Sequence, residues 1–170
     1  MPESAVSDTG PILHLSEVDC LSALKLFHRI FISDSVRSEL RRHSVCANAE
    51  ILLAGILETH RVRPIEIDAQ FEELSGFLLH RADLSVAALA KRIAPDVVLT
   101  DDLELRKALE ARGKLVVGSI GVLFRSFHNR QLTKDQLRMI LEQLFDDSTL
   151  YLTKALKKHV LARLDELTAP

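Results

Sequence analysis

The sequence predicts an α/β protein of three layers (α/β/α), with a mostly parallel central sheet and further helices at the C-terminal end. Short apolar runs of strand length, such as RIFIS (29–33) and DVVLT (96–100), alternate with amphipathic stretches of helical length. Such alternation is typical of a parallel sheet covered by helices on both faces. The 170 residues, of which 47% are hydrophobic and 27% charged, are enough for one ordinary domain with a real core.

The N-terminal elements follow from local patterns. SAVSD (4–8) is a weak first strand, because only its alanine and valine favour one. Residues 11–27 place apolar side chains at helical spacing and are expected as two short helices. The strand RIFIS comes next, and Asp34 or Ser35 is well suited to begin the helix after it.

Proline and apolar spacing define the middle of the chain. A helix is expected over 46–58, and RVRPIEI (61–67) is expected as an edge or irregular strand, because Pro64 cannot donate to a sheet ladder. The elements that follow are helices over 68–79 and 83–93, the strand DVVLT, a helix over 102–112, the strand KLVVG (114–118), and helices over 119–129 and 133–145.

The last segment, 149–167, has an apolar stripe with lysines and an arginine away from it. The stripe consists of Leu152, Leu156, Val160 and Leu164. We therefore expect one main domain over 1–145 and a helical extension over 146–170 that packs on the same domain.

The composition limits which classes of protein this chain can belong to. No apolar run reaches the ~18 to 20 residues that cross a bilayer, and MPESAVSDTG lacks the regions of a signal peptide, so we expect a cytoplasmic protein without a membrane partner. Cys20 and Cys46 lack zinc-type spacing and are expected to be buried, reduced apolar residues. With 24 acidic and 22 basic side chains, the net charge is −2, so any site for a polyanion must be local.

Acidic residues follow the predicted strands. Asp8 ends the first strand, and Asp101 and Asp102 end DVVLT. Glu39 lies one turn into the helix after RIFIS, and Asp83 begins the helix that leads to DVVLT. In open α/β sheets, ligands bind at the carboxyl ends of the strands, so we expect these carboxylates to converge there.

The chemistry of such a cluster suits a hard divalent cation. Mg²⁺ and Mn²⁺ prefer oxygen ligands, and two such ions can activate a water and stabilise the leaving oxygen in phosphodiester hydrolysis. Glu39 shares a helix face with Val36 and Leu40 and therefore points inward, where a carboxylate needs a partner. Ser7, Thr9 and Thr100 stand beside the acids and are expected to orient them by hydrogen bonds, as second-shell groups around the ion.

Each acid also has a purely structural interpretation. Asp8 before Thr-Gly-Pro is suited to shape a turn, and Glu39 to pair with Arg42 or His43 at the surface. Asp83 is suited to cap a helix, and Asp102 to place a favourable charge at a helix N-terminus. The joint placement of the acids favours the metal site over these separate explanations.

The spacing of these motifs resembles the PIN-domain nuclease family, in particular the VapC-like subgroup that begins Ser-Asp-Thr-Gly-Pro. The similarity covers most of residues 4–145. The matching motifs are SDTGPILHL (7–15), VRSEL (36–40), ADLSVAALA (82–90), VVLTDDLELRKA (97–108) and VVGSIGVL (116–123).

The resemblance implies a Mg²⁺- or Mn²⁺-dependent endoribonuclease in which Asp8, Glu39, Asp83 and Asp102 are catalytic and bind the metal, with Asp101 as a helper ligand. It also implies RNA as substrate and, for many relatives, a toxin role with an antitoxin protein as partner. The third motif departs from the subgroup, which usually has Gly-Glu and a second acid. This chain has Ala82-Asp83 and then Ser85.

RNA needs positive charge near the acids, because phosphates are repelled by bare carboxylates. The candidate RNA-binding side chains are Arg37, Arg41, Arg42, Arg81, Arg106 and Lys107, each of which also suits a solvated helix face. With one Tyr and no Trp there is little to stack on bases, so sequence-specific reading is not expected. His14 and His43 are more readily explained by packing or surface positions than by a general-base role.

Other functions remain to be weighed. An aspartic protease also carries Asp-Thr-Gly, but between β-strands, whereas Gly10-Pro11 enters a helical stretch here. A phospho-acceptor receiver domain would have its acid pair after the first strand, whereas this pair follows the fourth. The main alternative is a catalytically impaired PIN-like module that binds RNA or a protein.

A homodimer is also expected, through the C-terminal helix or the 46–58 region, because the apolar stripes exceed what one small sheet needs.

Overall fold

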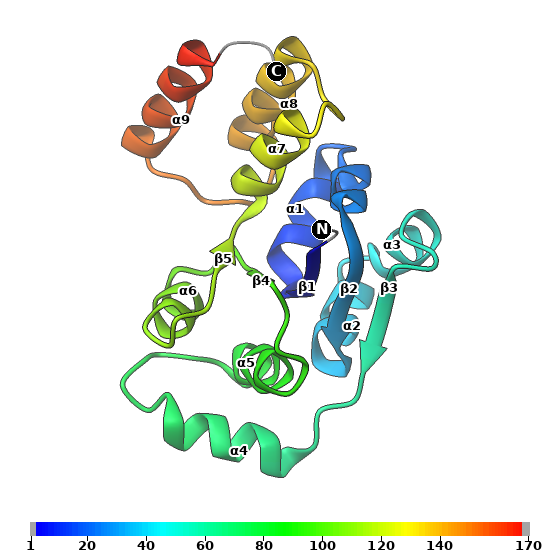
Figure 1. The fold of residues 1–170 in the computed structure, drawn as a ribbon, viewed down its shortest axis with the longest axis vertical. Helices are drawn as coiled ribbons and strands as arrows, with labels where there is room; N and C mark the ends of the chain where they lie inside the picture. The colour runs from blue at the N-terminus through cyan, green and yellow to red at the C-terminus, as the bar shows by residue number, and fades with distance from the viewer. Residues whose placement is uncertain (1–2, 168–170) are drawn as a thin grey trace.

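A computed structural model describes residues 3–167, which form a single five-stranded sheet with helices on both faces (Figure 1). The strand order is β3-β2-β1-β4-β5, and every neighbouring pair is parallel. The three-layer α/β/α architecture predicted from the sequence is confirmed. The strands are β1 (Glu3–Ser7), β2 (Phe27–Ser33), β3 (Leu57–His60), β4 (Val97–Leu99) and β5 (Val116–Val117).

The first strand of the chain is the central strand of the sheet. β1 pairs with β2 on one side, where Val6 is opposite Phe31, and with β4 on the other, where Val6 is opposite Val98. The chain builds β2 and β3 on one side of β1 and then crosses to build β4 and β5 on the other. The strand order therefore reverses between β1 and β4, which is where open α/β sheets bind ligands.

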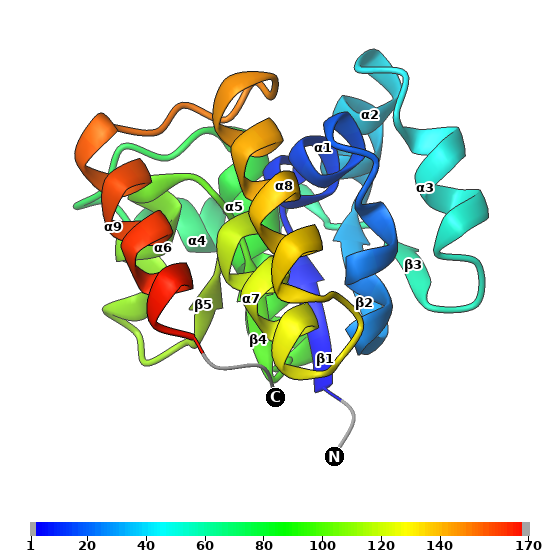
Figure 2. The same cartoon turned by 90° about the horizontal axis from the view of Figure 1, so that it is seen from above.

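The helices divide between the two faces of the sheet (Figures 1 and 2). On one face α1 packs against α7, and α8 lies outside both of them; on the other, α5 contacts β1 and β2, with α4 outside it and α6 beside it. The helical elements are α1 (Thr9–Glu17), the 3₁₀ helix η1 (Leu21–Leu26), α2 (Asp34–Arg42), α3 (Cys46–Leu52), α4 (Pro64–Glu73), α5 (Arg81–Ile93), α6 (Leu103–Glu110), α7 (Ser119–His128), α8 (Lys134–Asp146) and α9 (Lys154–Glu166).

The C-terminal segment, defined here as residues 147–167, lies against α8 and α1. In α9 only Val160 and Leu164 are buried. The Lys134 ammonium of α8 donates to the Leu167 carbonyl oxygen at 2.7 Å, and the backbone N–H of Thr149 donates to the Glu17 carboxylate of α1 at 2.8 Å. The segment is thus held by the burial of Val160 and Leu164 in the core and by polar contacts at its ends, while much of α9 is exposed.

The predicted strand over 61–67 is wrong. β3 lies earlier, at Leu57–His60, and Pro64 is the first residue of α4. A proline is favourable there because the first helical N–H has no intrahelical partner to lose. The Glu66 carboxylate also accepts the backbone N–H of Arg63 at 3.0 Å, which caps the new helix.

Several helix boundaries also shifted from their predicted positions. The helix predicted over 46–58 ends at Leu52, and Gly55 adopts φ +83°, a left-handed turn that leads into β3. The helix predicted over 68–79 is α4, which begins and ends earlier. Within residues 3–167, the structure has no helix with the length and apolar character needed to span a membrane.

The buried face of α2 allows a test of how tightly the core is packed. Leu40 is fully buried on α2, whereas Ile51 on the neighbouring α3 is 73% exposed. We expect Leu40→Ala to lower the free energy of unfolding by about 2 to 5 kcal/mol, because it opens a cavity. Ile51→Ala should change it by less than about 0.5 kcal/mol. Urea unfolding followed by circular dichroism measures both, and equal losses would show that the α2 face is not packed as described.

Candidate metal and nuclease site

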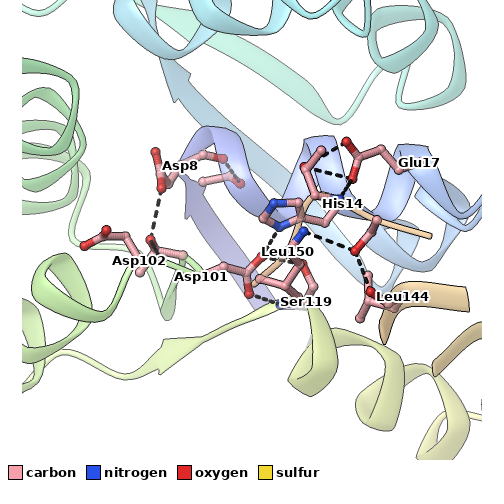
Figure 3. A network of polar contacts seen from close by, with 12 residues as sticks. Asp8, His14, Glu17, Asp101, Asp102, Ser119, Leu144 and Leu150 are labelled. Carbon is pink, nitrogen blue, oxygen red and sulfur yellow. Dashed lines mark hydrogen bonds and ion pairs between the residues drawn. The ribbon is translucent and has the colours of Figure 1, made fainter. Parts of the chain in front are cut away.

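The candidate site lies at the carboxyl ends of β1 and β4, where the strand order reverses. β1 ends at Ser7, so Asp8 is the first residue beyond it, and β4 ends at Leu99, just before Thr100, Asp101 and Asp102. The backbone N–H of Asp8 donates to the Leu99 carbonyl oxygen at 2.8 Å, so the two strand ends stay paired past the sheet. Figure 3 shows these acids side by side, although they are far apart in the sequence.

Asp8 is the most deeply buried of the acids, with 8% of its surface exposed. The hydroxyl of Thr100, which is fully buried, donates to Asp8 Oδ2 at 3.0 Å. The backbone N–H of Asp102 in turn donates to Thr100 Oγ1 at 3.1 Å. Thr100 therefore connects the two acids and holds the Asp8 side chain in place. Ser7, also fully buried, instead donates to the Asp8 carbonyl oxygen at 2.8 Å and supports the backbone.

Asp8 is a buried acid that lies near two other carboxylates. Burial, together with the charges of Asp83 and Glu39, raises the pKa of Asp8 from 3.8 to about 7, against the opposing effect of hydrogen bonds from the Thr9 backbone and the Thr100 hydroxyl. Burial, with a contribution from Asp102 and Glu39, also raises the pKa of Asp83. The four carboxylates are thus close enough to interact electrostatically.

Glu39 reaches the site from α2. Its side chain is 27% exposed, and Glu39 Oε2 accepts the hydroxyl of Thr9 at 2.5 Å. Thr9 begins α1 directly after Asp8, so this hydrogen bond ties α2 to the end of β1. Arg42 also lies 3.5 Å from Glu39 Oε1, which is the surface pairing considered from the sequence. One carboxylate therefore serves both contacts.

Asp83 and Asp102 each use one oxygen to cap a helix. Asp83 Oδ2 accepts the backbone N–H of His80 at 2.7 Å at the start of α5, and Asp102 Oδ1 accepts that of Leu105 at 2.7 Å at the start of α6. The structural interpretations drawn from the sequence thus describe real contacts of both side chains. Only one oxygen of each carboxylate accepts the capping N–H, so the other oxygen takes no part in the cap.

Two serines that the sequence did not indicate as structural links join the elements of the site. Ser33, the last residue of β2, lies with its hydroxyl 2.7 Å from that of Ser85 on α5, and both side chains are fully buried. Ser85 donates to the Ala82 carbonyl oxygen at 2.6 Å, so Ser33 donates to Ser85. The residue that departs from the third motif therefore connects the helix of Asp83 to the strand that leads to Glu39.

The donor set suits a hard divalent cation, since it consists of carboxylates whose mutual repulsion a cation would relieve. Over residues 3–167, however, no three His, Cys, Asp or Glu side chains come close enough together to enclose an ion. The predicted acids are thus neighbours at one edge of the sheet and are not arranged as a closed set of ligands.

Asp101 lies beside the site in a different setting. Asp101 Oδ1 accepts the backbone N–H of Ser119 at 2.7 Å, and Oδ2 accepts both the Ser119 hydroxyl at 2.5 Å and His14 Nδ1 at 2.8 Å (Figure 3). Gly118 packs so closely that an added Cβ would lie 2.5 Å from Asp101 Oδ1. We call Asp101, His14 and Ser119 the Asp101 bracket, because they join α1, the end of β4 and the start of α7. His14 is therefore more than a packing residue.

The predicted RNA-binding side chains differ in their surroundings. Arg37 pairs with Glu50 and Lys107 with Glu104, and Arg106 donates to the Thr100 and Val116 carbonyl oxygens at 3.1 Å each. Arg41 and Arg81 are exposed and form no ion pair within the described part of the chain. Arg106 thus supports the loop at the end of β4, whereas Arg41 and Arg81 face solvent.

The pKa of Asp8 generates a test of the site electrostatics. Because the folded protein binds the Asp8 proton more tightly than the unfolded chain, the stability that this group contributes is complete below about pH 4 and is lost as the pH rises through about 7. In EDTA, Asp8→Asn should therefore raise the free energy of unfolding at pH 8, by up to on the order of 4 kcal/mol. The gain should shrink towards pH 5.

Thermal unfolding of both chains at several pH values measures this difference. A loss of stability in Asp8→Asn that is the same at pH 8 and pH 5 would contradict a raised pKa. Asp68→Asn, at an exposed position on α4, is the control and should show no such dependence.

The close packing of the Asp101 bracket generates a second test. Gly118→Ala should lower the free energy of unfolding by about 1 to 3 kcal/mol, because the new methyl group would overlap Asp101 Oδ1. Gly76→Ala is the matched control, since nothing lies within 4 Å of a Cβ there. Chemical denaturation distinguishes them, and a neutral Gly118→Ala would show that the loop moves away easily.

Comparison with known proteins identifies the family. No curated protein matches the chain. Among solved structures, the crystal structure of the Mycobacterium tuberculosis toxin VapC20, described as cleaving the Sarcin-Ricin loop, has 17% sequence identity and a TM-score of 0.49, covering 61% of this chain and 94% of that one. The family model described as a PIN domain (DUF3368) matches residues 4–166. The chain therefore belongs to the PIN-domain family.

Proposed function

We propose that this protein is a metal-dependent endoribonuclease that hydrolyses RNA phosphodiester bonds at the carboxyl ends of β1 and β4. One observation carries the proposal: Asp8 is buried beside Asp83 and Glu39, no basic side chain of residues 3–167 is bonded to it, and its pKa is raised to about 7. Burying negative charge in this way is unfavourable unless a cation joins it. Membership of the PIN-domain family supports the same conclusion.

In this proposal Asp8, Glu39, Asp83 and Asp102 hold Mg²⁺ or Mn²⁺. Asp8 is the fixed member, held by Thr100, and Glu39 is oriented by Thr9. Asp83 and Asp102 each contribute the oxygen that does not cap a helix. Asp102 is exposed, so its side chain has room to turn towards the other three. When bound, a divalent ion polarises the phosphate and lowers the pKa of a water molecule.

The Asp101 bracket serves positioning in this proposal. Both of its carboxylate oxygens already accept hydrogen bonds, so we assign Asp101 to holding the loop that carries Asp102 rather than to direct metal binding. Arg41 beside Glu39 and Arg81 beside Asp83 are assigned to the RNA phosphates, because they are exposed.

Protein partners form the second part of the proposal. Ile51 and Leu52 on α3 are 73% and 38% exposed, and these apolar side chains suit a homodimer or the contact with an antitoxin. A toxin role would follow from such a partner.

We also propose that residues 146–170 are an extension of a main domain that spans 1–145.

RNA cleavage by the purified chain tests the enzyme. Wild type should cleave mixed RNA with Mn²⁺ and not with EDTA. Asp8→Asn and Asp102→Asn should lower the rate by more than about 100-fold, because even groups that only orient metal ligands contribute about 10- to 100-fold. Thr100→Val, which removes the hydroxyl that holds Asp8, should lower it by about 10- to 100-fold.

Asp68→Asn controls for the loss of a carboxylate away from the site and should cleave at the wild-type rate. Cleavage that survives both Asp8→Asn and Asp102→Asn would come from a contaminating nuclease and would refute the assignment. RNA binding without cleavage, with or without Mn²⁺, would instead favour the alternative of a catalytically impaired RNA-binding module.

A further inference from the structure

Two buried serines join the start of α2 to the start of α5. The backbone N–H of Val36 donates to Ser33 Oγ at 3.1 Å, so Ser33 caps α2. The hydroxyls of Ser33 and Ser85 lie 2.7 Å apart, and Ser85 donates to the Ala82 carbonyl oxygen at 2.6 Å in the first turn of α5. We call this chain of hydrogen bonds, from Val36 through Ser33 and Ser85 to Ala82, the serine relay.

The hydrogen bonds of the serine relay run in one direction. A hydroxyl has a single hydrogen to donate. Ser85 gives its hydrogen to Ala82, so it accepts from Ser33, which in turn accepts from Val36. Among residues 3–167, no other side-chain hydrogen bond joins α5 to β2 or α2. The relay is therefore the polar link between these elements.

Stability alone gives no reason for a serine at residue 85. Ser33 is explained by its cap of α2, whereas Ser85 is fully buried inside α5. Serine is not needed there to fill space, because the same helix buries Ala87, Ala88 and Ala90. Replacing a hydrogen-bonded pair by apolar groups of the same shape is close to neutral for stability. The relay is better explained by the relative position in which it holds the two helices.

The helices joined by the relay carry two of the proposed metal ligands. Asp83 lies two residues before Ser85, and Glu39 lies six residues after Ser33. Glu39 Oε2 accepts the hydroxyl of Thr9, and Asp83 Oδ2 caps the start of α5, so each side chain is held by a partner of its own. The separation of the two carboxylates therefore depends on how α2 and α5 lie relative to each other.

The separation of two carboxylates affects which cation they favour. Mg²⁺ takes oxygen ligands at about 2.0 to 2.1 Å in near-ideal octahedral geometry, usually one or two carboxylates with several waters, whereas Ca²⁺ accepts about 2.3 to 2.6 Å and flexible geometry. The acids of residues 3–167 do not form a closed set of ligands, which agrees with a magnesium site completed by waters. Helices in a fixed position suit the smaller ion, and helices that can shift also accept the larger one.

We propose that the serine relay sets the separation of the Glu39 and Asp83 carboxylates and thereby favours Mg²⁺ over the larger Ca²⁺. Ser33 and Ser85 are positioning residues in this inference, since neither is assigned to the ion itself. The inference rests on the proposed metal site and adds the basis of its ion selectivity.

Binding of Mg²⁺ and, separately, of Ca²⁺ to the full metal-free chain, measured by isothermal titration calorimetry, tests the relay. Ser85→Ala breaks the link to α5 and leaves the Ser33 cap of α2 in place. It should weaken Mg²⁺ binding by about 10- to 100-fold, as expected for groups that orient metal ligands. Ca²⁺ binding should weaken less, because Ca²⁺ tolerates a wider range of ligand positions. Loss of packing alone would not change the ratio of the two dissociation constants.

Two further variants separate positioning from stability. Ser33→Ala combined with Ser85→Ala should weaken Mg²⁺ binding no more than Ser33→Ala alone, because the two hydroxyls act as one unit. Ser126→Ala is the matched control, since Ser126 is also fully buried and donates to the Ala23 carbonyl oxygen at 3.3 Å, away from the acids. It should lower the unfolding temperature without changing the affinity for either ion. Thermal unfolding in EDTA shows that each variant is folded.

The outcomes separate this inference from the nuclease assignment. A wild type that binds Mg²⁺, with Ser85→Ala binding it equally well, would overturn the relay and leave the proposed function intact. An equal loss of Mg²⁺ and Ca²⁺ affinity in Ser85→Ala would also overturn it, as would the same selective loss in Ser126→Ala. A wild type that binds neither ion would refute the metal site itself, and the inference with it.

Discussion

The hydrogen bond from Thr100 to Asp8 is the interaction on which the rest of the site depends. It crosses from the end of β4 to the end of β1 and holds a buried carboxylate to which no basic side chain in the described part of the chain is bonded. The same threonine receives the backbone N–H of Asp102, so one hydroxyl sets the positions of both acids. Thr100 is fully buried, so water does not compete for these hydrogen bonds.

Around this centre, polar links keep separate helices in place. Thr9 holds Glu39, Ser33 meets Ser85, and Ser119 and His14 hold Asp101. Each link is a short hydroxyl or imidazole contact between elements that are distant in the sequence. Carboxylates gathered in this way repel one another, and the hydroxyl links of Thr9 and Thr100 supply opposing stabilisation without cancelling the negative charge. The arrangement therefore keeps its attraction for a cation.

The sequence predicted the order of strands and helices, because apolar runs of strand length alternate with helical stretches. That Asp8, Glu39, Asp83 and Asp102 form one metal site stays a prediction. The sequence could not predict that Pro64 begins a helix, since proline is equally suited to an edge strand and to a first helical turn. It also could not predict that Ser85 contacts Ser33, or that both carboxylate oxygens of Asp101 accept hydrogen bonds. Both depend on contacts across more than ten residues of sequence, and no local pattern records such contacts.

The central position of β1 has a consequence for synthesis on the ribosome. Asp8, which follows β1, emerges early, but its partner Thr100 lies 92 residues later and emerges only after β2, β3 and helices α1 to α5. Until then one edge of β1 is unpaired and its acid is hydrated. A nascent chain therefore cannot complete the pair of Asp8 and Thr100 until β4 has been made.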